Sequence, residues 1–143
     1  MQSRLLQIVV IGMMLLSGCG GAKSGPEPLP LDRVNCAKCG MLISSLANAG
    51  QAVSREAETR FYDDIGCMAA DTAMTGDANL FVQLADGTGW TPVTSAWFAA
   101  SPQMSTPMGY GFTAHASEEA ARKADAQPRA QSWAEIVRRG ERR

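Results

Sequence analysis

This chain has very little histidine and a small net charge. His115 is the only histidine among 143 residues, and the formal net charge is −1. A Ser/His/Asp triad would have to use His115, and no nucleophile-elbow motif accompanies it. The sequence also has no Gly-rich phosphate loop and no His-Glu-x-x-His pair. The near-neutral charge argues against nucleic acid as a partner, because a phosphate-binding domain is usually basic on one face.

The chain also lacks an apolar run of about 20 residues, the length that a transmembrane helix needs. A shorter apolar stretch, residues 5–16, follows Arg4 and leads into a Leu-Ser-Gly-Cys motif that ends at Cys19. This order is typical of a bacterial lipoprotein signal. We therefore expect residues 1–18 to be a signal peptide and Cys19 to carry acyl chains, palmitate among them, that anchor the chain in a lipid bilayer. The alternative is an ordinary cleaved signal peptide that leaves Cys19 as a thiol.

Such a signal predicts a domain on the periplasmic side of a bacterial membrane. Gly20, rather than Asp, follows Cys19, which favours sorting to the outer membrane. The next segment is rich in Gly and Pro and has too little apolar surface to order itself. Residues 19–31 are therefore expected to be a flexible tether, and residues 32–143 a single domain.

Past the tether, short strands and helices alternate, with turn residues between them. Asp63 or Asp64 would cap the first helix and Ser117 the second, because short polar side chains accept hydrogen bonds from free N–H groups. The pattern predicts an α+β domain with a mostly antiparallel sheet. Strands are expected at residues 52–54, 59–62, 80–84, 90–93 and 109–116, a strand or a helix at 96–100, and helices at 65–74, 118–126 and 132–139.

The number of cysteines limits how they can pair. The four cysteines are Cys19, Cys36, Cys39 and Cys67. Acylation of the first leaves three, and an odd number of thiols in an oxidising compartment cannot all pair within one chain. At least one of the three cysteines must therefore form no disulfide within the chain, and free exposed thiols oxidise readily. A metal ligand or a buried position is therefore favoured.

Two sulfur side chains lie two residues apart, at Cys39 and Met41, so in an extended chain they point to the same face. Gly40 between them lets the backbone bend freely. Soft sulfur ligands of this kind select Cu(I) over hard cations. A further donor is needed, and Met108 is the best candidate because it lies in a Thr-Pro-Met-Gly loop that suits core packing poorly. The alternative is that Met108 fills a gap in the core.

Four other side chains are possible additional metal ligands. Cys36 could instead form a disulfide with Cys39 or Cys67, and the position of Cys67 favours a small buried hydrophobe over a metal ligand. Met68 is next to it on a helix, and neighbours there point about 100° apart, which disfavours both facing one ion. His115 fits a surface position on the wet side of a strand. The full set of possible additional ligands is Cys36, Cys67, Met68 and His115.

Two other functions fit part of the pattern. Cys36 and Cys39 have the Cys-x-x-Cys spacing of an exported thiol–disulfide oxidoreductase, although they follow a linker and not a strand-to-helix turn. A structural zinc domain would need four N or S donors, which Cys36, Cys39, Cys67 and His115 could supply in number.

The ordered motifs resemble those of the NosL family, which are copper-binding lipoproteins associated with maturation of nitrous oxide reductase. The similarity runs over residues 16–120. The motifs that carry it are Leu-Ser-Gly-Cys ending at Cys19, Cys-x-x-Cys-Gly-Met from Cys36, Phe-Tyr-Asp-Asp-Ile-Gly-Cys-Met from Phe61, and Thr-Pro-Met-Gly-x-Gly from Thr106.

The resemblance implies a periplasmic Cu(I) chaperone, not an enzyme, that delivers copper for assembly of the copper centre of nitrous oxide reductase. It implies that the reductase and its maturation proteins are partners. It also implies paired ββαβ-like units within the one domain. Its motifs place the metal ligands at Cys39, Met41 and Met108, the donors that the spacing also favours.

Overall fold

The computed structural model describes residues 24–71 and 77–142. The expected signal peptide, the acylated Cys19 and the expected end of the first helix at residue 74 lie outside the described residues. Within the described part of the chain, no helix is both long enough and apolar enough to cross a membrane.

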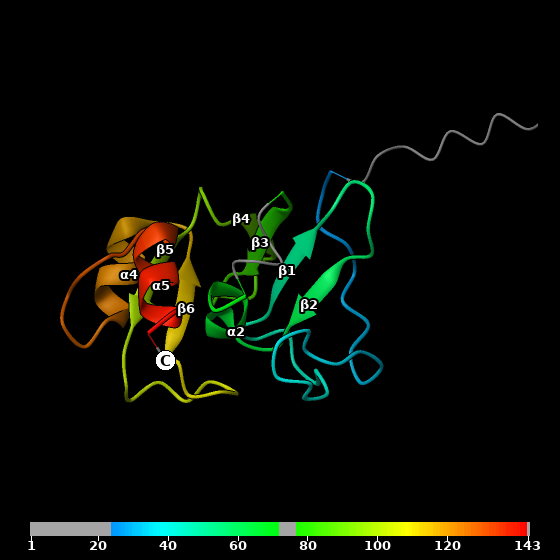
Figure 1. The fold of residues 1–143 in the computed structure, drawn as a ribbon. Coiled ribbons are helices and arrows are strands. Elements are labelled where there is room, and N and C mark those ends of the chain that lie inside the picture. The colour runs from blue at the N-terminus through cyan, green and yellow to red at the C-terminus, as the bar shows by residue number, and fades with distance from the viewer. Residues whose placement is uncertain (1–23, 72–76, 143) are drawn as a thin grey trace, which may run out of the picture.

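The larger sheet has four antiparallel strands in the order β2-β1-β3-β4 (Figure 1). Strand β1 (Gly50–Val53) pairs on one side with β2 (Arg60–Tyr62) and on the other with β3 (Asn79–Gln83). Strand β4 (Trp90–Pro92) pairs with β3. These strands agree with the predicted ones to within a few residues, because the β-branched and aromatic residues of each run lie between turn residues.

The smaller sheet is the hairpin of β5 (Trp97–Ala100) and β6 (Phe112–His115). The run at 96–100, which fitted a strand or a helix, is therefore a strand. Strand β6 begins later than the predicted residue 109, because Gly109 and Gly111 each have a φ of +70°, which no strand adopts. A parallel bridge between Leu84 and Ala114 connects the two sheets.

Three short helices are described, and each begins after a polar residue. Helix α2 (Ile65–Ala69) has Asp64 as its N-cap, and α4 (Glu118–Ala124) has Ser117, as predicted. Helix α5 (Trp133–Gly140) starts with a capping box between Ser132 and Glu135. Helix α2 is shorter than predicted, since Ala70 already closes its last turn through hydrogen bonds to Gly66 and Met68.

The two sheets belong to two units built on the same plan. In the first, the hairpin β1-β2 is followed by α2, and β3 then returns to pair with β1. In the second, the hairpin β5-β6 is followed by α4, and the chain then returns to β5 through a bridge between Gln131 and Phe98. The prediction of an α+β fold with antiparallel pairing in ββαβ-like units is confirmed, with the last strand of the second unit reduced to a single bridge.

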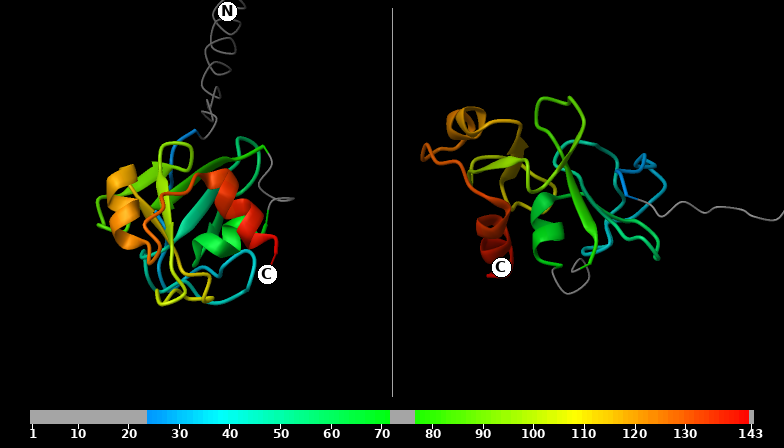
Figure 2. Two further views of the ribbon diagram at one scale, coloured as in Figure 1. Left: turned by 90° about the vertical axis from the view of Figure 1, so that its left-hand side faces the viewer. Right: turned by 90° about the horizontal axis from the view of Figure 1, so that it is seen from above.

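Helix α2 lies between the two units, and all five of its residues are buried. It packs against α5, which lies beside it in both views of Figure 2. The approach is close: a Cβ added at Gly140 of α5 would lie 3.0 Å from the Cβ of Ala69. The fully buried side chains of the core gather around this helix and include Tyr62, Ile65, Met68, Phe98 and Ile136.

The last part of the expected tether lies on the domain. The backbone N–H of Glu27 donates to the Oε1 of Gln51 at 2.8 Å, and the Nε2 of Gln51 donates back to the Glu27 carbonyl at 3.0 Å. Leu29 and Leu31 pack against the core. These leucines supply apolar surface among the prolines, so this part of the segment contacts the domain.

Gly66 is required where the loop of the second unit crosses α2. A Cβ at this position would lie 1.9 Å from the Cγ of Tyr110. Alanine would gain up to about 1 kcal/mol in helix propensity. That gain is smaller than the cost of moving a packed ring.

We therefore predict that Gly66→Ala lowers the free energy of unfolding by about 1–3 kcal/mol, as measured by urea denaturation. Gly25→Ala is the matched control, because no atom lies within 4 Å of a Cβ added there. Equal stability of the two variants would show that the ring of Tyr110 does not pack on the helix as described.

Candidate metal centre

Three cysteines and one aspartate converge beneath the surface of the first unit. The ligand atoms of Cys36, Cys39, Asp63 and Cys67 all lie within 4.8 Å of one another. A zinc–sulfur bond is about 2.3 Å long, so two sulfur ligands of one ion lie at most about 4.6 Å apart. The sulfur–carboxylate cluster, as we call these four residues, is therefore close to the size at which one ion contacts every member.

The Cys-x-x-Cys segment forms a tight turn that holds the first two thiols. The backbone N–H of Cys36 donates to the Met41 carbonyl at 2.7 Å, and that of Gly40 donates to the Cys36 carbonyl at 2.9 Å. Gly40 has a φ of +78°, which favours glycine. A further bond of 2.8 Å from Ala37 to the carbonyl of Phe61 ties the turn to β2.

The other two members follow that same strand. Asp63 and Asp64 connect β2 to α2, and Cys67 is the third residue of the helix. Asp64 caps the helix through a 2.8 Å bond from the N–H of Gly66. Asp63 instead takes part in the cluster, as expected of adjacent residues in an extended chain, which point to opposite sides.

The sequence predicted only that Asp63 or Asp64 would cap the helix, so Asp63 is the member of the cluster that sequence reasoning missed. The alternation of side-chain direction before a helix is the signal that separates Asp63 from Asp64.

The members of the cluster differ in their exposure. Cys36 and Cys67 are 2% and 1% exposed, and Asp63 is 4% exposed. Cys39 is half-buried and forms the side of the cluster nearest the solvent. All three cysteines are free thiols, so neither of the disulfides considered from the sequence is formed among the described residues.

Hydrogen bonding within the cluster sets which thiol is ionised. A hydrogen bond from the thiol of Cys67 lowers the pKa of Cys36 to about 4, against the opposing effect of burial. The same bond raises the pKa of Cys67, and burial adds to the rise. At neutral pH the pair therefore holds one thiolate and one thiol.

The outer pair of the cluster has raised pKa values. Burial raises the pKa of Cys39, so this residue is a thiol at pH 7. It donates to both oxygens of Asp63, with sulfur–oxygen distances of 3.6 and 3.7 Å. Burial also raises the pKa of Asp63, to about 6. The cluster thus has a preformed thiolate at Cys36 and two further thiols that a metal ion can deprotonate.

The two predicted thioether ligands are exposed at the surface. Met41 is 47% exposed, and its backbone N–H bonds to the sulfur of Cys39. Met108 is 41% exposed, so it does not fill a gap in the core. Its backbone N–H donates to the Oδ2 of Asp64 at 2.9 Å. That bond holds the loop of Met108 against the start of the helix that carries Cys67.

The remaining predicted donors lie outside the cluster. Met68 is fully buried, and its Sδ would be 2.9 Å from a Cβ added at Gly50, so it packs under β1. The Nε2 of His115 pairs with the Oγ1 of Thr113 at 2.9 Å, and burial lowers the pKa of this imidazole. His115 is not part of the group of His, Cys, Asp and Glu side chains that could hold a metal ion among the described residues.

A known fold has the same architecture. The structure is similar to the crystal structure of the copper chaperone NosL from Shewanella denitrificans, with a TM-score of 0.65 and 13% sequence identity. The match covers 79% of this chain and 96% of that chain. No model of a protein family matches this chain, and no curated protein matches it in sequence. The structural resemblance to NosL that the motif order predicted is therefore confirmed at the level of the fold.

The number of protons released on metal binding will identify the ligands. Binding of Cu(I) through Cys36, Cys39 and Cys67 at pH 7 should release about two protons, because only Cys36 is already ionised. Binding through Cys39 with thioethers alone should release about one. Asp63, with a pKa of about 6, adds only about a tenth of a proton. The measurement is anaerobic calorimetry in two buffers of different protonation enthalpy.

Release that falls by about one proton in Cys67→Ser would confirm the buried thiols as ligands. Release that is unchanged in this variant would exclude Cys67 from the metal site.

Proposed function

We propose that this chain is a membrane-anchored periplasmic chaperone that binds Cu(I) and delivers it for assembly of the copper centre of nitrous oxide reductase. The observation that carries the proposal is the cluster of three thiols in a NosL-like fold, with Met41 in the Cys-x-x-Cys turn and Met108 in the loop that is bonded to Asp64. Cys39, Met41 and Met108 are the proposed ligands, and Cys36 and Cys67 are the adjoining thiols.

The sulfur donors are soft ligands, which supports Cu(I) as the ion that the protein carries. Thiolate and thioether sulfurs select Cu(I) over hard divalent ions. The carboxylate of Asp63 is a hard oxygen donor, and its place in the cluster is to accept hydrogen bonds from the thiol of Cys39. A zinc ion would instead use this oxygen with the three sulfurs to complete four ligands. Zinc in the anaerobically purified protein, bound in place of copper, would favour a structural zinc site.

Exposure of the thioethers supports transfer of the ion. Thioethers are neutral and bind more weakly than thiolates, so an ion held partly by Met41 and Met108 can be released to a partner. Both side chains are more than two-fifths exposed, which lets a recipient's ligands approach the ion directly. Nitrous oxide reductase and its maturation proteins are the proposed partners on the strength of the motif resemblance and the matching fold.

The alternative of a thiol–disulfide oxidoreductase has one observation in its favour. The low pKa of Cys36, about 4, is in the range of the reactive cysteine in such enzymes. Its 2% exposure, however, leaves the thiolate out of reach of a substrate disulfide. We therefore propose a binding protein and not an enzyme. Reduction of insulin at a rate comparable to that of a thioredoxin would overturn this choice.

Removal of a proposed ligand should weaken Cu(I) binding. We predict that Cys39→Ser and Met108→Leu each raise the Kd for Cu(I) at least tenfold, about 1.4 kcal/mol, in an anaerobic competition titration with a chromophoric chelator. Met104→Leu is the matched control, because Met104 lies in the same loop and is not a proposed ligand. An unchanged Kd in both ligand variants would mean that the ion binds elsewhere.

The anchor can be tested separately. We predict that Cys19→Ser moves the protein from the membrane fraction to the soluble periplasmic fraction, since it removes the sulfur that would be acylated. The measurement is immunoblotting of fractionated cells, with Cys67→Ser as a cysteine control. Membrane association of the Cys19 variant would show that the anchor lies elsewhere.

A further inference from the structure

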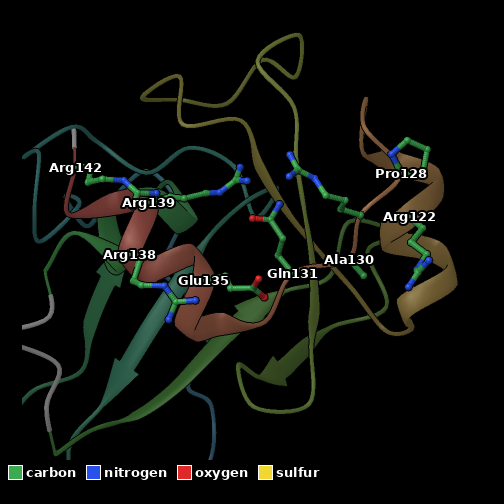
Figure 3. Close-up of a pocket in the computed structure, with 9 residues that line it drawn as sticks. Arg122, Pro128, Ala130, Gln131, Glu135, Arg138, Arg139 and Arg142 are labelled. Carbon is green, nitrogen blue, oxygen red and sulfur yellow. The ribbon is translucent and has the colours of Figure 1, made fainter.

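A second concave site lies in the other unit, between α4, α5 and the segment that connects them. Figure 3 shows this pocket, which has a volume of about 370 Å³. Most of its lining is cationic. The arginine pocket, as we call it, contains the five arginines Arg122, Arg129, Arg138, Arg139 and Arg142.

The positive charge of the pocket is poorly neutralised. Arg122 forms an ion pair with Glu118. Glu135, the one carboxylate in the lining, is held by hydrogen bonds from the backbone and hydroxyl of Ser132. Among residues 24–71 and 77–142, no ion pair involves Arg138, Arg139 or Arg142. The charge is also segregated, since seven of the 13 Lys and Arg residues follow residue 121 in a chain of net charge −1.

A buried amide in the pocket has an unused acceptor. Gln131 is 4% exposed, and its backbone is fixed by the bridge to Phe98. Its Nε2 donates to Asp125 at 3.4 Å, while its Oε1 has no hydrogen-bond donor in the described structure. The side chain rises into the space between the arginines in Figure 3. A buried acceptor without a donor is costly, so a ligand that brings an N–H group would be stabilised here.

A second depression lies next to the arginine pocket. Arg139 and Arg142 also line a neighbouring depression of about 440 Å³, whose other walls are residues 100–102 with Tyr110 and Phe112. The two depressions share Arg139 and Arg142, and the second reaches Tyr110 in the loop that bears Met108. An inorganic phosphate would fill only part of this space, whereas a peptide segment is large enough to occupy both depressions.

Three features therefore describe the ligand. Guanidinium groups bind carboxylates through two parallel N–H donors. The orphaned oxygen of Gln131 requires an N–H donor, which a peptide backbone carries. The aromatic walls at Tyr110 and Phe112 suit an apolar side chain. An acidic peptide provides all three.

The position of the pocket argues against a lipid head group. The chain enters the described structure at the opposite end from α4 and α5 in Figure 1 and in the right-hand view of Figure 2. A membrane that holds the N-terminal side of the domain would face the larger sheet and not the arginine pocket.

We propose that the arginine pocket and its extension bind an acidic peptide segment of a partner protein. The arginines hold the carboxylates, and the Oε1 of Gln131 accepts from a backbone N–H of the peptide. The bound segment would lie beside the loop of Met108. This binding does not depend on which metal ion the sulfur–carboxylate cluster holds.

The experiment uses a fluorescein-labelled decapeptide of alternating Glu and Gly, titrated with the metal-free protein and followed by fluorescence anisotropy. The expected result is saturable binding that weakens at least tenfold in Arg139→Gln/Arg142→Gln. Arg33→Gln/Arg55→Gln is the matched control, because it removes the same charge from exposed positions outside the pocket. It should change the Kd less than twofold. Circular dichroism melting verifies that both variants fold.

Four outcomes would contradict the proposal. Equal losses of affinity for the peptide in the two double variants would mean that binding is a non-specific attraction between opposite charges. Displacement of the peptide by equimolar inorganic phosphate would identify a small oxyanion site. Tighter binding to vesicles containing phosphatidylglycerol than to the peptide, lost in Arg139→Gln/Arg142→Gln, would identify a membrane contact. A gain of affinity in Gln131→Met would also contradict the role given to its amide.

Discussion

The buried carboxylate of Asp64 is the contact on which the shape of the metal centre depends. One oxygen accepts from the N–H of Gly66 and so starts α2. The other accepts from the hydroxyl of Thr106 at 2.7 Å and from the N–H of Met108. A single side chain, 0% exposed, therefore fixes a helix of the first unit to a loop of the second. Because each of these donors would be costly to leave unpaired in the interior, the loop has one stable position.

That constraint orders the sulfur atoms by depth. The Cys-x-x-Cys turn and the first turn of α2 bring Cys36 and Cys67 together in the interior, where their hydrogen bond concentrates the negative charge on one sulfur. Cys39 lies between this pair and the solvent. Met41 and Met108 are exposed. The sulfur side chains therefore range from buried and ionised to exposed and neutral.

Local signals were sufficient for most of the fold. Asp64 and Ser117 begin helices because their side chains accept hydrogen bonds from free N–H groups, and this is readable from residue type. The end of α2 could not be predicted from residue type, because Asp71, just beyond it, is bound by Arg60 and Tyr62 from a neighbouring strand. The metal-binding residues were likewise predicted only where they are close in sequence. Cys39 and Met41 are neighbours in sequence and were identified, whereas Asp63 joins Cys36 and Cys67 only through the tertiary arrangement.

Charge explains why thioethers would serve a carrier of Cu(I) better than more thiolates. The thiolate of Cys39 with two thioethers balances the charge of the ion and leaves only the thiolate of Cys36 beside Asp63, but three thiolate ligands give the complex a charge of −2 there. Burying that excess is costly unless protons or cations compensate it. Cys39 belongs to the set with Met41 and Met108 and also to the set with Cys36 and Cys67. An ion bound to the sulfur of Cys39 could therefore be completed by the exposed thioethers, ready for release, or by the buried thiols. In the proposed function, the donors that complete the site would decide whether the protein retains copper or passes it on.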